Sequence, residues 1–281
     1  MDSNRYKRHP VKNGYGVACC RYNKQKKQME VLMIKKRYTY YYIEFILGHY
    51  PVGDLTRIKY LLNNMTHDEK MEIYSKEFGR MWYRIWLTNP DNPTHNVKSD
   101  VDKSHYIRCK KKFERTFSQN SDPNLLHKLL SESKNDETIW EIPKGRKDHP
   151  QESDLNCAIR ELHEETGMSC AEYTILSEID PLELKFSNRR ACYHYTYYVA
   201  VEDNSIVRNK CKWSHQYQNE DKFKINFKNI NQISEVASIQ WMTLNKLKNL
   251  DKTNRYAPFV QKLFAILKNR YQLGKLSNLN L

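Results

Sequence analysis

The sequence has few of the features that build a disulfide framework, a zinc site or a membrane segment. Its seven cysteines are odd in number, and no two of them form a Cys-x-x-Cys pair. That usage fits a reducing compartment better than a secreted scaffold. The chain opens without an apolar signal region, and the hydrophobic stretch from Tyr40 to Leu47 is short and interrupted by Glu44. We therefore expect a soluble, cytoplasmic protein without a membrane span.

Positive charge is in excess. The 281 residues include 47 Lys and Arg against 33 Asp and Glu, for a formal net charge of +14 and a pI near 9.3. Such a balance is typical of proteins that bind RNA, although a lysine-rich proteome would produce part of the same excess. The length suits one elaborated domain or two small ones.

Residues 153–167 have the pattern of a short amphipathic helix. Ser153 or Asp154 can cap the amino end, and Gly167 can supply the left-handed residue at the carboxyl end, which limits the helix to about three turns. Apolar residues recur at intervals of three and four, so they share one face that must meet a core. These residues are Leu155, Ala158, Ile159 and Leu162.

Carboxylates occupy another face of this helix. Glu161, Glu164 and Glu165 are neighbours there, and Glu152 lies just before the helix begins. Like charges at this spacing destabilise a helix unless something neutralises them, and no lysine follows at the next i+4 positions. A solvated acidic face is the alternative interpretation. We favour a site for a hard divalent cation, because Mg²⁺ and Mn²⁺ prefer carboxylate oxygens and complete their shells with water and phosphates.

This segment resembles the Nudix box, the signature of hydrolases that cleave nucleoside diphosphates linked to another moiety. The box reads Gly, five residues, Glu, seven residues, then Arg-Glu-apolar-any-Glu-Glu-any-Gly-apolar, and the chain matches it from Glu152 through Met168. One departure is that six residues, not five, separate Gly145 from Glu152. We interpret it as a one-residue loop insertion, since moving the glutamate to Gln151 would break the next spacing.

Other segments narrow the resemblance. The run from Trp140 to Gly145 resembles the Trp-x-x-Pro-Lys-Gly of Nudix enzymes that remove the cap from messenger RNA, and the run from Glu235 to Trp241 resembles their late strand. Residues 63–66 and 78–86 are similar to the asfarvirus-type decapping proteins of large cytoplasmic DNA viruses. The resemblance spans nearly the whole chain from about Tyr15, and it implies a viral enzyme that acts in the host cytoplasm.

The resemblance implies a role for each matched residue. Glu161, Glu164, Glu165 and then Glu152 are expected to hold one or more Mg²⁺ or Mn²⁺ ions. Glu164 and Glu235 are the candidate catalytic residues, with Glu235 as the general base. The structural and phosphate-contacting candidates are Arg160, pointing away from the metal face and pairing with a carboxylate, together with Lys144 and the backbone of Gly145.

The order of strand and helix patterns predicts an α/β fold, a Nudix α-β-α sandwich with a mixed sheet interrupted by a helical insertion. Residues 15–22 and 30–37 read as a hairpin, and strand patterns return at 138–142, 173–180, 191–202 and 236–241. Helical spacing marks 55–64, 67–87, 122–134 and 255–271. The predicted parts are 1–37 for the first part of the Nudix domain, 38–136 for the insertion, and 137–281 for the second part with its C-terminal helix.

Basic residues near the end of the insertion are the candidates for an RNA track, since contacts to phosphate need no sequence specificity. They could equally be an ordinary solvated surface. The residues are Lys98, Lys103, Arg108, Lys110, Lys111, Lys112 and Arg115. Tyr38, Tyr40, Tyr41 and Tyr42 offer rings that could stack on the cationic methylguanine of a cap, although core packing would explain most of them.

Three functions therefore compete. The first is hydrolysis of capped mRNA to 7-methyl-GDP and 5′-monophosphate RNA, with capped mRNA of host and virus as partner. The second is hydrolysis of diphosphoinositol or dinucleoside polyphosphates, which a basic surface would also attract. The third is a non-catalytic module that binds RNA or the cap, which the intact set of glutamates argues against. A homodimer is compatible with the sequence, which does not fix the oligomeric state.

Overall fold

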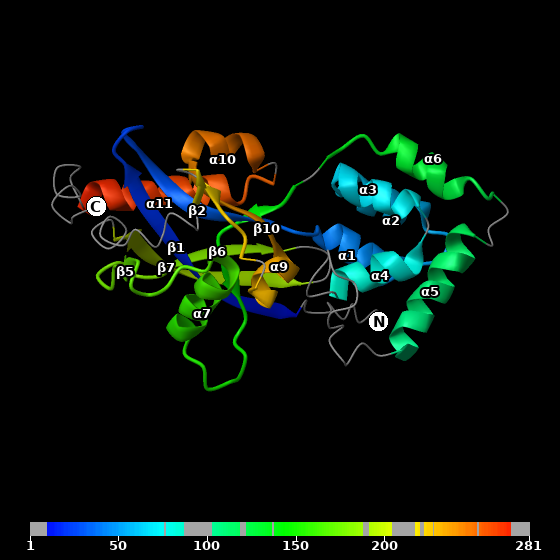
Figure 1. Cartoon of the computed structure of the whole chain (residues 1–281), viewed down its shortest axis with the longest axis horizontal. Coiled ribbons are helices and arrows are strands. Elements are labelled where there is room, and N and C mark those ends of the chain that lie inside the picture. Colours follow the sequence, from blue (N-terminus) through cyan, green and yellow to red (C-terminus); the bar gives the residue numbers. More distant parts are fainter. Residues whose placement is uncertain are drawn as a thin grey trace, which may run out of the picture. The chain divides into compact units, whose positions relative to one another are not determined.

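The computed structural model describes residues 10–75, 77–86, 103–118, 122–136, 138–187, 191–203, 217–219, 222–226, 228–251 and 253–270. The chain divides into two compact units (Figure 1). The first comprises Met1–Ile34, Trp140–Ile225 and Ser238–Leu281, and the second comprises Lys35–Ile139 and Asn226–Ala237. The predicted insertion, 38–136, lies inside the second unit. Residues 226–237, which the sequence placed in the Nudix domain, also belong to the second unit.

A mixed β-sheet forms the centre of the first unit. Strand β1 pairs antiparallel with β2, which confirms the predicted hairpin, and parallel with β7. Within the described residues the strand order is β5-β7-β1-β2-β10-β9-β8, with β3 beside β2, β4 beside β1 and β6 beside β7. The strands are β1 (Val11–Asn23), β2 (Gln28–Lys36), β3 (Trp140–Glu141), β4 (Lys144–Gly145), β5 (Tyr173–Ile175), β6 (Leu182–Ser187), β7 (Cys192–Glu202), β8 (Tyr217–Asn219), β9 (Lys222–Phe223) and β10 (Val236–Thr243).

Helices cover both faces of this sheet, as Figure 1 shows. Helices α10 (Leu244–Leu250) and α11 (Tyr256–Arg270) lie over one face, where Val260 and Leu263 share a buried cluster with Ala18 and Met33 of the hairpin. Helix α7 (Asp154–Thr166) packs on β1, β4 and β7 from the other side. The predicted α-β-α sandwich with a mixed sheet is therefore confirmed.

The second unit is built from helices around an aromatic core. Phe45, Trp82, Phe113 and Phe117 are almost completely buried there, and Phe45 contacts both other phenylalanine rings. The helices are α1 (Tyr40–Ile46), α2 (Leu55–Asn63), α3 (His67–Tyr74), α4 (Phe78–Trp86), α5 (Lys103–Phe117), α6 (Leu125–Glu132) and α9 (Ile230–Glu235). Helices α1, α5 and α9 were not predicted from the sequence.

One predicted helix, 67–87, is in fact two. Helix α3 ends at Tyr74 and α4 begins at Phe78, so the helical spacing predicted from 67 to 87 is interrupted. Met71 and Tyr74 are therefore 53% and 50% exposed, whereas Phe78 and Met81 are buried. Within the described residues, no helix is long and apolar enough to cross a membrane.

Candidate active site

Helix α7 begins and ends where its sequence predicts. The Ser153 hydroxyl caps the helix by accepting a hydrogen bond from the Asn156 amide at 3.1 Å, which selects Ser153 over Asp154 as the capping residue. Gly167 has a φ of 79°, in the left-handed region that favours glycine, and its amide donates to the His163 carbonyl. The local sequence alone therefore fixes the length of the helix.

The buried face of α7 differs in part from the predicted stripe. Ala158 and Leu162 are fully buried, as expected, but Leu155 and Ile159 are only half-buried. Cys157, which the spacing did not select, is buried instead. The helix therefore meets the sheet along a face centred closer to Cys157, which buries Glu165 and leaves Glu164 partly exposed.

Gly145 packs directly beneath one of these carboxylates. The residue lies in β4, opposite Tyr15 of β1, and a Cβ built on it would overlap the carboxyl group of Glu161. Any side chain at this position would therefore displace Glu161. The glycine at the start of the box therefore leaves room for the Glu161 carboxyl group against the strand, even though the following loop is one residue longer than the family pattern.

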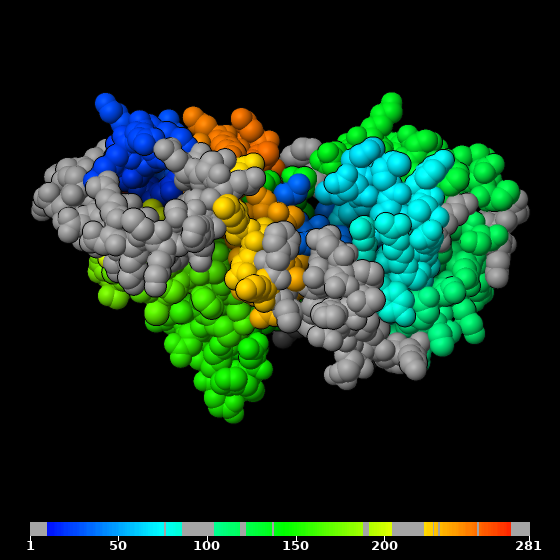
Figure 2. All heavy atoms as spheres, viewed as in Figure 1, coloured from blue at the N-terminus to red at the C-terminus, as the bar shows by residue number. Residues whose placement is uncertain are grey.

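The longer loop is held by its own backbone and by Arg160. The Asp148 amide donates to Glu152 at 3.0 Å, and the Arg160 guanidinium donates to the Arg146 carbonyl at 2.7 Å. Asp148 itself lies 3.4 Å from Arg160. No pattern in the sequence singles out Asp148 or Arg146, because their contacts depend on how this loop folds back. The green part of the first unit, which holds this loop and α7, reaches the surface in Figure 2.

The Arg160 side chain is the centre of the site. Its Nε donates to Glu152 at 2.8 Å, while one terminal nitrogen, Nη1, donates to Glu161 at 2.8 Å and to Glu164 at 3.1 Å. Arg160 thus pairs with a carboxylate, as expected, but its predicted orientation was wrong. The guanidinium does not point away from the acidic face, because three carboxylates converge on it.

Glu165 faces the strand rather than the guanidinium. It is 3% exposed, and its carboxylate accepts a hydrogen bond from the Lys144 amide at 2.8 Å. The Lys144 ammonium pairs with Glu141 at 2.9 Å and lies over the Tyr195 ring at 4.9 Å from its centroid. Lys144 is therefore held by the protein, and a contact between its ammonium and a phosphate stays a prediction. The sequence did not single out Glu141, whose pairing follows from the path of the chain through Pro143.

Charge pairing sets the electrostatics of the cluster. Hydrogen bonds from Arg160 lower the pKa of Glu152 to about 2, and the Asp148 amide acts in the same direction. Hydrogen bonds to Glu152 and Glu161 in turn raise the pKa of Arg160 above its ordinary range. Glu152 is therefore ionised at any physiological pH, and Arg160 carries a full charge.

The donor set fits a hard divalent cation only if the ion competes with Arg160. Among the described residues, no group of three His, Cys, Asp or Glu side chains is arranged as a ready metal site. Glu161 and Glu164 nevertheless meet at one nitrogen of Arg160, so their oxygens already converge on a single positive charge. A cation bound by these two carboxylates would take over that interaction, while Nε and the other terminal nitrogen of Arg160 would still hold Glu152.

Glu235 belongs to the second unit. It is the last residue of α9, directly before β10, and its side chain is 57% exposed. Its carboxylate pairs with the Lys36 ammonium at 2.9 Å, and its carbonyl accepts a hydrogen bond from the Arg37 amide. The strand predicted after Glu235 is confirmed as β10. A role of Glu235 as general base stays a prediction.

The basic residues predicted for RNA binding have different environments. Lys98 lies outside the described residues, and Lys103 begins helix α5. Lys112 donates to the Gly48 carbonyl at 2.8 Å, which gives it a structural role. Lys110 lies 3.9 Å from Glu114. The other three, spaced by three and four residues, are exposed along one face of α5; they are Arg108, Lys111 and Arg115.

Comparison with known proteins places these observations in a family. The model of the NUDIX domain matches residues 125–263. The chain is 30% identical over 266 residues to the mRNA-decapping protein g5R of African swine fever virus, covering 92% of this chain and 95% of g5R. The g5R protein of the warthog isolate from Namibia is also 30% identical, with 92% and 97% covered.

Among solved structures, the chain is similar to an Ap4A hydrolase of C. elegans. The identity is 12% and the TM-score 0.42, with 92% of this chain and 98% of the hydrolase covered. A likeness at this level supports no conclusion about substrate. Membership in a family therefore depends on the sequence relatives and on the matched domain.

Proposed function

This chain belongs to the Nudix hydrolase family, and on that premise we propose that it removes the 5′ cap from messenger RNA. The products would be 7-methyl-GDP and RNA with a 5′-monophosphate. The observation that carries the proposal is the similarity to g5R, named as an mRNA-decapping protein, across 92% of this chain and thus through both units. The box alone would not select a substrate, because enzymes with many substrates share it.

We assign the metal-binding role to the carboxylates of α7. Nudix hydrolases generally need divalent metal ions, and Mg²⁺ or Mn²⁺ bound by Glu161 and Glu164 would neutralise charge on the pyrophosphate. Glu165 could join them only by leaving the Lys144 amide that it now binds. Arg160 keeps Glu161 and Glu164 together before a metal binds, and it fixes Glu152 against the loop. Gly145 allows the strand to approach Glu161.

Proton transfer is assigned to Glu235. An exposed carboxylate can accept a proton from an attacking water, and the Lys36 ammonium restricts its position. Lys36 is therefore a positioning residue in this proposal. The prediction is that Glu235→Gln lowers kcat, and that Lys36→Met also lowers kcat but leaves the affinity for metal unchanged.

The RNA chain is proposed to lie along the exposed face of α5. Arg108, Lys111 and Arg115 follow each other at helical spacing there, so they can contact successive phosphates without reading sequence. We place this activity in the host cytoplasm, where capped transcripts occur.

The test is incubation of cap-labelled RNA with the protein and Mn²⁺, followed by identification of the released nucleotide. Release of 7-methyl-GDP is expected from the native protein, and Glu164→Gln should abolish it while leaving RNA binding intact. Glu183→Gln is the matched control, because Glu183 is an exposed glutamate of the same unit that pairs only locally with Lys185. Full hydrolysis by Glu164→Gln would contradict the metal assignment.

A comparison of substrates separates the competing functions. Faster turnover of long capped RNA than of a free cap analogue supports decapping. Equal turnover, or preference for diphosphoinositol or dinucleoside polyphosphates, supports the small-molecule hydrolase. Binding without hydrolysis of any of them supports the non-catalytic module.

A further inference from the structure

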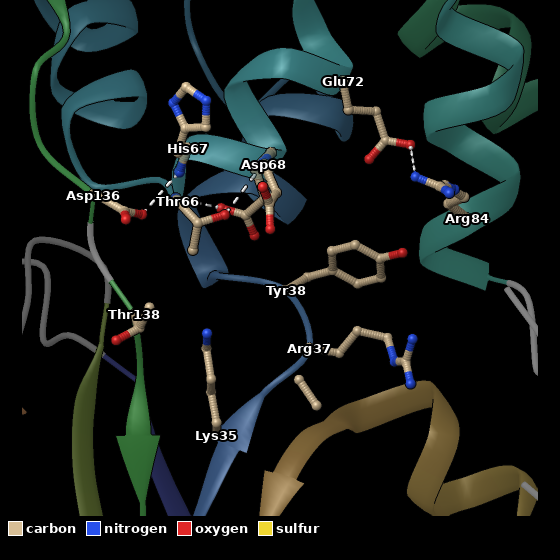
Figure 3. A pocket seen from close by; sticks show the side chains of 12 residues that line it. Lys35, Arg37, Tyr38, Thr66, His67, Asp68, Glu72, Arg84, Asp136 and Thr138 are labelled. Carbon is tan, nitrogen blue, oxygen red and sulfur yellow. Dashed lines mark hydrogen bonds and ion pairs between the residues drawn. The ribbon is translucent and has the colours of Figure 1, made fainter.

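The second unit contains a pocket of about 250 Å³ that the chemistry of the box does not use. All of its lining residues belong to this unit. Lys35 and Arg37, at the end of β2, stand on one side, and helix α3 closes the opposite side (Figure 3). The ring of Tyr38 projects between them.

Several charged groups of the lining already have partners in the fold. Glu69 accepts hydrogen bonds from the amide and hydroxyl of Thr39 and from the Thr66 amide, which joins α1 to α3. Glu72 pairs with Arg84 at 2.8 Å and accepts a hydrogen bond from the Tyr42 hydroxyl at 2.8 Å. These groups shape the pocket, and their charges are already engaged in hydrogen bonds and ion pairs that hold its walls together.

Two oppositely charged side chains in the lining have no such interactions within the described residues. Within the described part of the chain, neither the Lys35 ammonium nor the Asp68 carboxylate has a hydrogen-bonding or ion-pairing partner. They face the same hollow from opposite sides without meeting. A ligand that accepts a hydrogen bond at one point and donates at another could bridge them.

The overall charge of the lining restricts the ligand further. Three cations, Lys35, Arg37 and Arg84, stand against the carboxyl groups of Asp68, Glu72 and Asp136, and against Glu69, whose pKa of about 7 leaves it only partly charged at neutral pH. The pocket is therefore not positive, in a chain whose net charge is +14. A polyphosphate would be repelled by the carboxylates, whereas a cationic or strongly donating base would be attracted.

We propose that this pocket binds the 7-methylguanine base of the cap, an inference that rests on the proposed decapping function. The methylated base carries a positive charge and a planar ring, so it can stack on Tyr38. Its N1–H and amino group donate, which Asp68 accepts, and Lys35 on the opposite side can donate to a hydroxyl of the attached ribose. The phosphates lie outside the pocket.

Binding of 7-methyl-GDP to the full chain tests this assignment without any hydrolysis. Affinity for 7-methyl-GDP, GDP and inorganic pyrophosphate is measured by titration calorimetry in the absence of metal. The native protein should bind 7-methyl-GDP more tightly than GDP. Asp68→Asn should weaken 7-methyl-GDP by about tenfold, because a charged acceptor is lost. Tyr38→Leu should weaken it similarly, and pyrophosphate should be unaffected by both changes.

Matched controls show whether the loss is local. Glu132→Gln removes an exposed carboxylate of the same unit that pairs with Lys59 outside the pocket. Tyr60→Leu removes a tyrosine that is 49% exposed on α2. Both should bind 7-methyl-GDP as the native protein does. Circular dichroism of Asp68→Asn and Lys35→Gln confirms that each variant is folded.

The outcomes separate the pocket from the reaction. If capped RNA is hydrolysed but Asp68→Asn and Lys35→Gln bind 7-methyl-GDP within twofold of the native protein, the pocket assignment is wrong and decapping stands. Equal binding of GDP and 7-methyl-GDP would also overturn the assignment, since the pocket would not read the methylated base. If 7-methyl-GDP binds as predicted but capped RNA is not cleaved, the pocket stands and the proposed hydrolysis fails.

Discussion

In the first unit the Glu152 carboxylate lies against the guanidinium of Arg160, whereas in the second unit Glu69 is held by the amides and hydroxyls of Thr39 and Thr66. The pKa of Glu152 is lowered to about 2 by its bonds to Arg160. The pKa of Glu69 is raised to about 7 because burial outweighs its hydrogen bonds. A neighbouring cation thus keeps the Glu152 carboxylate ionised, whereas the buried Glu69, without one, serves mainly to connect two helices.

The largest expected effect comes from removing the glycine that leaves room for the Glu161 carboxyl group. Gly145→Val would place a branched side chain where the Glu161 carboxyl now lies, so Glu161 would lose its place beside Arg160. We expect hydrolysis of capped RNA to become undetectable. RNA binding should persist because the second unit is unchanged. Gly53→Val, at an exposed turn with free space around it, is the steric control, although its φ of 83° will cost some stability.

Replacing Arg160 tests whether its guanidinium organises the carboxylates of the first unit. Arg160→Lys keeps the charge but cannot contact Glu152, Glu161 and Glu164 together, because an ammonium lacks the planar fork of the guanidinium. A fall of about 100-fold in kcat is expected, since misplaced groups commonly cost this much. The measurement is single-turnover hydrolysis at saturating Mn²⁺. Unchanged kcat would show that Arg160 does not organise the carboxylates.

The acidic site of the first unit could be predicted from the sequence far better than the helical second unit. Capping residues and the spacing of glutamates act locally, so α7 and its acidic face followed from Ser153, Gly167 and the i, i+3, i+4 rule. The orientation of Arg160 did not follow, because it depends on a loop that folds back through the Arg146 carbonyl.

Long-range contacts explain most of what was missed in the second unit. Helix α1 starts in a run of tyrosines whose preference is for strands, and its buried Phe45 becomes part of the core only when Phe113 and Phe117 of α5 pack against it. Helix α5 was not predicted because its many lysines mask the apolar pattern, although Tyr106, Cys109 and Phe113 repeat at helical spacing. The pocket is built from segments that are distant in sequence and had no local signal.

The raised pKa of Glu69 in the second unit can be tested by measuring stability at different pH values. Glu69 has a folded pKa of about 7 and an unfolded value near 4.5, so the folded state holds a proton that the unfolded state has lost between these values. The free energy of unfolding should therefore be highest below pH 4.5 and fall as the pH rises to 7, by roughly 3 kcal/mol from this residue. Glu69→Gln should remove that dependence in urea unfolding measured at pH 5 and pH 8.

The opposite result has a clear meaning. If the native protein is more stable than Glu69→Gln at pH 8, the Thr39 and Thr66 donors keep Glu69 ionised and outweigh burial. Glu152 contributes with the opposite sign, because its lowered pKa gives stability that is present above pH 4.5 and lost as the pH falls toward 2. The two carboxylates therefore act in different pH windows and can be distinguished in one titration.

The smallest effect concerns positive charge. Arg160 is surrounded by carboxylates, whereas Arg108, Lys111 and Arg115 are exposed on α5. Replacing these three by alanine should weaken RNA binding and reduce the slope of log K against log salt by roughly 2, since each lost contact to a single strand changes it by about 0.7. Lys59→Ala with Lys128→Ala is the control, because these exposed lysines pair with Glu132 and Asp122. A slope equal to that of the native protein would mean that RNA does not follow α5, and that this positive face only keeps the unit soluble.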